Sequence, residues 1–345
     1  MTRKTLILAL LTATIIAASS CIEPPLHLRQ SLEVLVKVLW KVDVYPDGEK
    51  PDGITLYFFR EGEFYMQHTT SNVDSCVVQL APGRYKLYMI SQSPEEYWTM
   101  DFEDLHDFDN ARVSVVETKS SWYTRSEEEV VINNPEIMLA GVSQEFEVTE
   151  DMIYLQRKNA TKAPDNTYYY TIVVPIAPQS ITSQYWVTIY SDNADVLKAV
   201  RASTTGMART FYLTQGKTGD DEGTQLITQW TLTIDDEQRR VGHLDGYITT
   251  FGFPRGELPS SDRDSTLNVT TLLVDEETVE NYVFYVGDKI HLEDPPAGYR
   301  YLYRIIFGSI FEPAIHPKNV KPKGTGGFTA GVTDWDEEMT LDIGI

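Results

Sequence analysis

The setting of Cys21 points directly to a chemical modification of its thiol. The cysteine follows three small residues, 18–20, which end a nearly unbroken apolar run over residues 6–18, and Arg3 and Lys4 precede that run. This order of basic, apolar and small residues is typical of a secretory signal peptide. A cysteine directly after the small residues predicts a bacterial lipoprotein, in which the thiol receives a diacylglycerol and becomes the new N-terminus.

The apolar run also allows a simpler interpretation, in which an ordinary signal peptide is cleaved near Ser20 and Cys21 carries no lipid. Ala18 stands where leucine is commonest in lipoprotein signals. We favour lipidation, because several acyl chains, each burying CH₂ groups at roughly 0.8 kcal/mol, hold a protein at a membrane. The run is shorter than the roughly 20 apolar residues of a transmembrane helix. The sequence therefore predicts a chain that is anchored to a membrane without crossing it.

The acidic segment 101–109 is the best candidate metal site. Oxygen ligands at alternating positions can hold calcium, and the weak candidate ligands are Asp101, Glu103, Asp107 and Asp109. The segment lacks the glycine and the bidentate glutamate spacing of an EF-hand loop. The favoured interpretation is a solvated acidic loop, with no metal and no cofactor.

Motifs for catalysis are missing from the sequence. It contains no Gly-x-Ser-x-Gly, His-Glu-x-x-His, phosphate-binding glycine loop or Cys-x-x-Cys, and no two of its six histidines lie at ligand spacing. Cys76 stands at the edge of an apolar run, which favours a small buried hydrophobic side chain. We therefore expect a protein that is not an enzyme.

Apolar and polar residues alternate with a period of two along most of the chain, which predicts strands. Strands are expected at residues 32–44, 54–59, 77–80, 83–90, 111–116, 129–132, 144–148, 168–176, 185–190, 210–213, 226–234, 246–253, 267–274, 282–286, 299–307 and 339–343. Pro82-Gly83 predicts a tight turn that joins two of them in a hairpin. A short helical turn is predicted at residues 196–201, and no helix longer than two turns.

Many short strands with Pro, Gly and Asp turns favour an all-β fold of two tandem β-sandwiches. A polar, locally basic segment at residues 156–166 marks the boundary between them. The predicted units are a signal peptide at 1–20, a lipidated linker at 21–30, an N-terminal β-sandwich at 31–155 and a C-terminal β-sandwich at 167–345.

The formal net charge is −22, and such a surface repels nucleic acid and anionic lipid head groups. Neither is expected as a partner. Two aromatic clusters, Trp122-Tyr123 and Tyr168-Tyr169-Tyr170, could offer stacking platforms for sugars. Aromatic residues are also common in strands for packing reasons, and packing is the favoured interpretation.

A set of short structural motifs extends over nearly the whole chain. Its members are Cys21, Pro25-Leu26, Val36-x-Val38-x-Trp40, the run 53–59, Leu80-x-Pro82-Gly83-x-Tyr85 and Gly327-Phe328-x-x-x-Val332-x-Asp334-Trp335. This set resembles the fimbrillin-like lipoproteins of Bacteroidetes, and most of all a branch known only as a domain of unknown function. The resemblance implies two transthyretin-like β-sandwiches and a role as stalk, tip or anchor subunit of a fimbria.

The resemblance also implies that the first strand distinguishes a stalk subunit from an anchor subunit. Stalk subunits of this superfamily are cut after an arginine in that strand, and the vacated groove takes a strand donated by a neighbour. Here the candidate processing site is Arg29, which precedes the strand predicted at 32–44. A cut at Arg29 would remove the lipid but leave the strand, which favours an uncleaved, membrane-retained subunit such as an anchor.

We therefore expect a surface-exposed lipoprotein of the cell outer membrane that is a structural or adhesive component of a fimbria-like assembly. Its expected partners are the outer membrane through the lipid anchor, other fimbrial subunits by strand addition, and a host or glycan ligand. The alternative is a surface glycan-binding lipoprotein that works with an outer-membrane nutrient importer.

Overall fold

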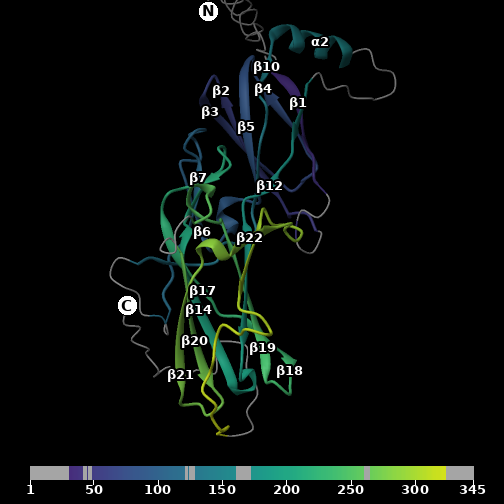
Figure 1. Cartoon of the computed structure of the whole chain (residues 1–345). Coiled ribbons are helices and arrows are strands. Elements are labelled where there is room, and N and C mark those ends of the chain that lie inside the picture. Colours follow the sequence, from purple (N-terminus) through teal and green to yellow (C-terminus); the bar gives the residue numbers. More distant parts are fainter. Residues whose placement is uncertain are drawn as a thin grey trace, which may run out of the picture.

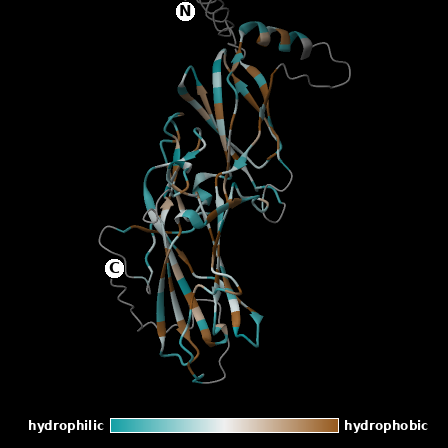
Figure 2. Ribbon diagram, viewed as in Figure 1, coloured by the Kyte–Doolittle hydropathy of each residue, from teal (hydrophilic) through white to brown (hydrophobic). Residues whose placement is uncertain are grey.

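A computed structural model describes residues 31–41, 45, 49–120, 123, 129–160, 172–259 and 265–323. Its strands form five sheets, and the molecule is elongated, with one sandwich above another (Figure 1). Hydrophobic and hydrophilic residues alternate along many of the strands (Figure 2). The predicted all-β sandwich fold is confirmed. No helix in the described ranges is long and apolar enough to cross a membrane.

The first sandwich has a three-stranded sheet with the N-terminal strand at its centre. Strand β1 (Leu32–Val38) pairs antiparallel with β4 (Ser75–Leu80) and parallel with β11 (Ile172–Ile176). Val34 and Val36 of β1 are fully buried, so the alternation read from the sequence places one face of the strand in the core.

The strand predicted at residues 32–44 is shorter than expected. Leu39 still donates its amide to the carbonyl of Ile176 at 2.7 Å. Trp40 then donates its indole N–H to the carbonyl of Val73 at 3.1 Å, and strand pairing ends at Val38. The prediction was wrong for residues 39–41, and residues 42–44 lie outside the described residues.

The second sheet of this sandwich faces the first across an apolar core, to which Leu56, Phe58 and Leu87 contribute. Its strands are β2 (Ile54–Arg60), β3 (Glu63–Thr70), β5 (Gly83–Ser91), β9 (Leu139–Val142), β10 (Phe146–Val148) and β12 (Gln179–Ser180). The order is β12-β9-β5-β2-β3, and β10 pairs with β5.

The turn at Pro82-Gly83 does not close a hairpin. Strand β4 pairs with β1 and strand β5 pairs with β2 and β9, so the turn carries the chain from one sheet to the other. The Tyr85 hydroxyl donates to the carbonyl of Ala81 at 2.8 Å, and the Arg60 guanidinium binds the carbonyl of Pro82. Gly83 has a φ of 153°, and a Cβ there would meet the Arg60 side chain. The tight turn was predicted correctly, but its sheet partners were not.

A helix of three turns, α2 (Glu150–Ala160), follows β10 and was not predicted. Thr149 begins it, because its hydroxyl accepts the amide of Met152 at 3.3 Å. Ile153 is buried in the core of the first sandwich. The helix has too few apolar residues to show a helical period in the sequence.

The second sandwich consists of two five-stranded sheets. One has the order β18-β19-β13-β23-β22 and the other β21-β20-β14-β17-β8. The first comprises β13 (Ser183–Ser191), β18 (Trp230–Asp236), β19 (Val241–Thr250), β22 (Ile290–Glu293) and β23 (Leu302–Phe307), and the second comprises β8 (Val131–Ile132), β14 (Leu197–Ala208), β17 (Glu222–Ile227), β20 (Thr266–Leu273) and β21 (Val279–Tyr285). Trp230 fills the core between them, and the absence of a side chain at Gly246 makes room for its ring.

Residues 196–201 were predicted as a helical turn, and this was wrong. Only a 3₁₀ turn at Ala194–Val196 is helical, and the chain then enters β14, the longest strand. Ala199, Val200, Arg201 and Ala202 are all buried, because β14 is covered on both faces. A strand of this kind shows no alternation in its sequence.

A small four-stranded sheet lies between the two sandwiches (Figure 1). It has the order β16-β15-β7-β6 and comprises β6 (Met100–Glu103), β7 (Arg112–Val115), β15 (Thr210–Tyr212) and β16 (Lys217–Thr218). A third apolar cluster joins β2 and β5 to it, with Tyr88, Val113 and Phe211 among its members. Further 3₁₀ turns are η1 (Pro94–Glu96), η3 (Pro254–Gly256) and η4 (Gly287–Lys289).

Strand pairing crosses the predicted boundary at residues 156–166 in both directions. Strands β11 and β12 follow the boundary but pair with β1 and β9. Strand β8 precedes it but pairs with β17. The division into units 31–155 and 167–345 stays a prediction.

Candidate functional site

Several residues singled out in the sequence lie outside the described residues. These are the lipidation candidate Cys21, the processing candidate Arg29, and the aromatic residues Trp122, Tyr168, Tyr169 and Tyr170. Tyr123 is described, and its hydroxyl donates to Glu129 at 2.7 Å. Burial raises the pKa of the Tyr123 hydroxyl. A ring held in this way is packed against the protein and is a poor stacking platform.

The structure does not gather the four carboxylates proposed for calcium. Asp101 and Glu103 lie on strand β6, whereas the Asp107 carboxylate accepts the amide of Asp109 at 3.1 Å and the side-chain amide of Asn110 at 2.8 Å. The hydrogen bond from Asn110 lowers the pKa of Asp107. Across the described part of the chain, no group of three or more His, Cys, Asp or Glu side chains could hold a metal ion.

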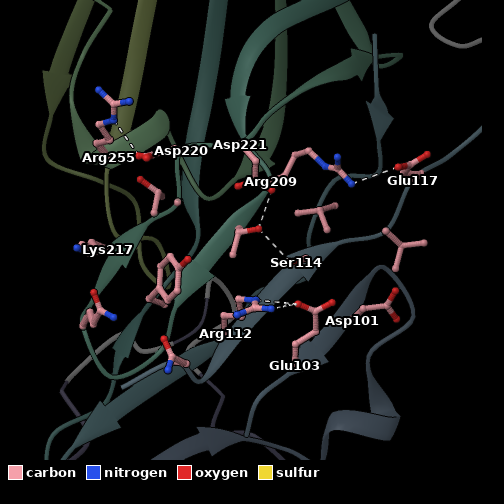
Figure 3. A pocket seen from close by; sticks show the side chains of 18 residues that line it. Asp101, Glu103, Arg112, Ser114, Glu117, Arg209, Lys217, Asp220, Asp221 and Arg255 are labelled. Carbon is pink, nitrogen blue, oxygen red and sulfur yellow. Dashed lines mark hydrogen bonds and ion pairs between the residues drawn. The ribbon is translucent and has the colours of Figure 1, made fainter. Parts of the chain in front are cut away.

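A cleft of about 1100 Å³ lies over the small sheet between the sandwiches (Figure 3). Strands β6 and β7 from the first half of the chain supply Asp101, Glu103, Arg112 and Ser114. Strands β15 and β16 and the segments beyond them supply Thr210, Tyr212, Lys217, Asp221 and Arg255. The pairing of β7 with β15 brings these distant segments to one surface.

Three arginines on the cleft are held by carboxylates. Arg112 binds Glu103 at 2.7 Å and Asp104 at 2.8 Å. Arg209 binds Glu117 at 3.3 Å. The hydrogen bond that Arg112 donates to Glu103 raises the pKa of Arg112. Figure 3 shows the Arg112–Glu103 and Arg209–Glu117 pairs as dashed lines. Each pair fixes a planar guanidinium at the wall of the cleft.

The third arginine, Arg255, binds Asp220 at 2.8 Å near the rim, and the hydrogen bond that it donates to Asp220 raises its pKa. On the floor, the Thr210 hydroxyl donates to Asp221 at 2.8 Å and lies 3.0 Å from the Ser114 hydroxyl. These contacts join the two halves of the sheet across the β7–β15 pair.

Lys217 and Asp101 lie on opposite sides of the cleft in Figure 3. Within the described ranges neither side chain has an ion pair, whereas the arginines do. Histidine and cysteine are not among the described residues that line the cleft. The arrangement offers charged and hydrogen-bonding groups of both signs. It is therefore suited to binding a polar ligand.

The cleft was not predicted from the sequence, in which Asp101 and Glu103 were only weak candidate ligands for calcium. No motif connects residues about a hundred positions apart. Only strand pairing places them together, and pairing was not readable from the sequence.

The family described as "Domain of unknown function (DUF5119)" matches residues 25–228. No curated protein matches the chain. Among solved structures, a candidate adhesin from Bacteroides ovatus is similar with a TM-score of 0.53 and 12% identity, over 85% of this chain and 94% of that one. The fimbrial anchor protein Mfa2 from Porphyromonas gingivalis has a TM-score of 0.45 and 12% identity, over 80% and 90%.

Proposed function

The chain belongs to the DUF5119 family, and we propose that it is a structural or adhesive component of a fimbria-like assembly on the cell surface. The main support is the fold, because the structure of the Bacteroides ovatus candidate adhesin is matched over 94% of its length. The motifs shared with fimbrillin-like lipoproteins, from Cys21 to Tyr85, support the same role. The charged and hydrogen-bonding groups of the cleft are suited to binding a ligand.

Within such an assembly we propose the role of a membrane-retained subunit, such as an anchor. Strand β1 lies at the centre of its sheet, between β4 and β11. Arg29 precedes β1, so a cut there would leave the strand in place. Removal of β1 would take Val34 and Val36, which are fully buried, out of the core of the first sandwich. An intact β1 fits a chain that keeps its lipid on Cys21.

Neighbouring subunits would add strands at the open edges of the first sandwich. Strands β3 and β11 each pair on one side only within the described residues. Along β3, exposed and half-buried residues alternate, so a partner strand could pair there without displacing the core. This edge is tested with a Gln67→Pro variant, because Gln67 is exposed on β3. We expect fewer neighbouring subunits to co-purify with this variant. Gln144→Pro, at an exposed position outside any strand, is the matched control and should leave co-purification unchanged.

The decisive test of the surface role uses intact cells. Wild-type chain and the Cys21→Ala variant are expressed in a Bacteroides host, and cells are treated with trypsin before fractionation and blotting. We expect wild type in the membrane fraction and accessible to trypsin, and the variant released. The Cys76→Ala variant is the matched control, because Cys76 is buried in β4, and it should behave as wild type. A shielded wild type, or an unreleased Cys21→Ala variant, would refute the anchored surface role.

A second candidate function is recognition of a glycan in the cleft. The observation that favours it is the set of planar polar groups, with Arg112, Asn110 and Gln215 beside the ring of Tyr212. Sugar hydroxyls bind such groups by paired hydrogen bonds, and an aromatic ring can cover the apolar face of a sugar. A glycan array probed with wild type and with Tyr212→Ala tests it. Signals that Tyr212→Ala leaves unchanged would exclude the cleft.

A further inference from the structure

Helix α2 is fixed beside the start of the first strand. The Gln156 side-chain amide donates to the carbonyl of Glu33 at 2.9 Å, and the amide of Glu33 donates to the Gln156 carbonyl oxygen, also at 2.9 Å. Ile153 is buried in the core of the first sandwich. The helix therefore cannot move away from β1 without breaking these contacts. It occupies the end of the molecule opposite strands β18 and β21 (Figure 1).

The outer face of α2 differs from the rest of this acidic protein. Tyr154 is 64% exposed and Leu155 is 48% exposed, and Arg157 and Lys158 follow in the last turn. Tyr154 and Lys158 are one helical turn apart, so they share a face. An exposed aromatic ring, an exposed leucine and two cations therefore lie together at one end of a chain whose net charge is −22, next to Glu150 and Asp151 in the first turn of the same helix.

The sequence sets how far this helix can lie from a lipid on Cys21. About ten residues separate Cys21 from Leu32, the first residue of β1. A fully extended chain of that length spans at most about 35 Å. Because Gln156 ties α2 to Glu33, the helix is confined to the same distance from the membrane.

We propose that the outer face of α2 lies on the surface of the lipid bilayer and orients the molecule on it. This rests on the proposed lipid anchor. Tyrosine is favoured at the boundary between lipid and water, where its ring is apolar and its hydroxyl is hydrated. Leu155 adds apolar contact, and the two cations lie at the level of the lipid phosphates. The overall negative charge opposes anionic lipids, so the surface that fits is a zwitterionic one.

A single tyrosine and leucine bind a bilayer weakly in free solution. The tether changes this, because it converts the contact into an intramolecular event at a high effective concentration. The consequence is orientation, with α2 against the bilayer and the turn between β18 and β19 directed away from it.

The proposal is tested by the depth of a fluorescent probe. The chain from residue 22 onward, with a histidine tag in place of Cys21, is held on phosphatidylcholine vesicles that contain nickel-chelating lipid and brominated lipid as a quencher. A dye is attached at Asp151→Cys on the outer face of α2, or at Glu237→Cys in the turn between β18 and β19. Cys76 is buried and does not compete for the dye. This tether does not depend on natural lipidation, so the result is separate from the test of the anchor.

We expect most of the fluorescence at position 151 to be quenched on the vesicles and that at position 237 to be unchanged. Adding Tyr154→Ser and Leu155→Ser should restore the fluorescence at position 151, whereas Thr69→Ser and Gln67→Ser on β3 should not. Equal quenching at positions 151 and 237, or no effect of the serines, would overturn the proposal. Quenching at 151 that appears only when two chains crowd on one vesicle would assign the face to a second copy and also overturn it.

Discussion

The two sandwiches of this protein are closed in different ways. In the first, β1 is held by β11, which follows α2 and lies more than a hundred residues further along the chain. In the second, ten strands form two full sheets, and only β8 comes from before residue 183. The difference teaches that the first sandwich is completed late in the sequence, whereas the second is nearly complete by itself.

The first sandwich is also the one with an exposed helix, α2. Its sheet β11-β1-β4 has three strands, against five in each sheet of the second sandwich. The third apolar cluster, with Tyr88 and Phe211, lies between them and joins residues of both. Each sandwich also has an apolar core of its own, so we expect a substitution in one of these cores to act mainly on the sandwich that contains it, and less on the other.

The largest effect is expected in the core of the second sandwich. Trp230 is 1% exposed, and its indole N–H donates to the carbonyl of Ile227 at 3.1 Å. Trp230→Ala should lower the free energy of unfolding by about 3–5 kcal/mol, because the ring leaves a cavity. Denaturant unfolding followed by circular dichroism measures this. Trp98→Ala is the control, since Trp98 is 87% exposed and its loss should change stability by at most about 0.5 kcal/mol.

A smaller effect is expected at the junction of α2 with β1. Gln156→Ala removes two hydrogen bonds to the backbone of Glu33 and should cost about 1–2 kcal/mol, because each bond contributes roughly 0.5–1.5 kcal/mol. Hydrogen exchange should accelerate at Glu33 and not at Trp230. Gln144→Ala, at an exposed position, is the control. Equal acceleration in both sandwiches would show that they open together.

In the cleft between the sandwiches, the effect on stability should be smaller still. Arg112 is partly exposed and binds Glu103 and Asp104, and such pairs contribute roughly 0.2–1 kcal/mol. Arg112→Met should therefore leave the melting temperature nearly unchanged but lower the affinity of the cleft for any ligand that binds there. A large loss of stability would mean that this pair holds the small sheet together.

The smallest effect on stability at neutral pH is expected from the ionisation of the Cys76 thiol on β4. Burial raises the pKa of its thiol from 9.0 to about 11. The neutral thiol therefore favours the folded state below pH 9, and this contribution is lost as the pH rises through about 11. Reaction with a thiol reagent at pH 8 should be slow in the native chain and fast in denaturant. Fast labelling of the native chain would indicate that the edge strand β4 opens readily.

The sequence predicted the class of fold because alternation is local. The four apolar residues at 32, 34, 36 and 38 identified β1 and its buried face without knowledge of any partner. The turn at Pro82-Gly83 was predicted from the φ preferences of two residues. Its partners were not, because β4 and β5 pair with strands elsewhere in the chain.

Other errors have physical causes of the same kind. Strand β14 is covered on both faces, so Ala199 and Val200 are both buried and show no period of two. Helix α2 is held by Gln156 and Ile153 and not by an apolar stripe. The cleft depends on the pairing of β7 with β15, and long-range pairing leaves no local pattern. Residue types predicted what each segment is, but not which segments meet.

The parallel pairing of β1 with β11 determines how the protein responds to mechanical force. If the chain is held by a lipid at Cys21 and pulled at its far end, tension enters β1 at Leu32 and leaves β11 at Ile176. The two strands run in the same direction, so the pull slides one along the other and strains their whole hydrogen-bonded ladder at once. A hairpin pulled from its open end would instead break one bond at a time. The first sandwich is thus arranged as a shear joint that resists a pull applied between Leu32 and Ile176.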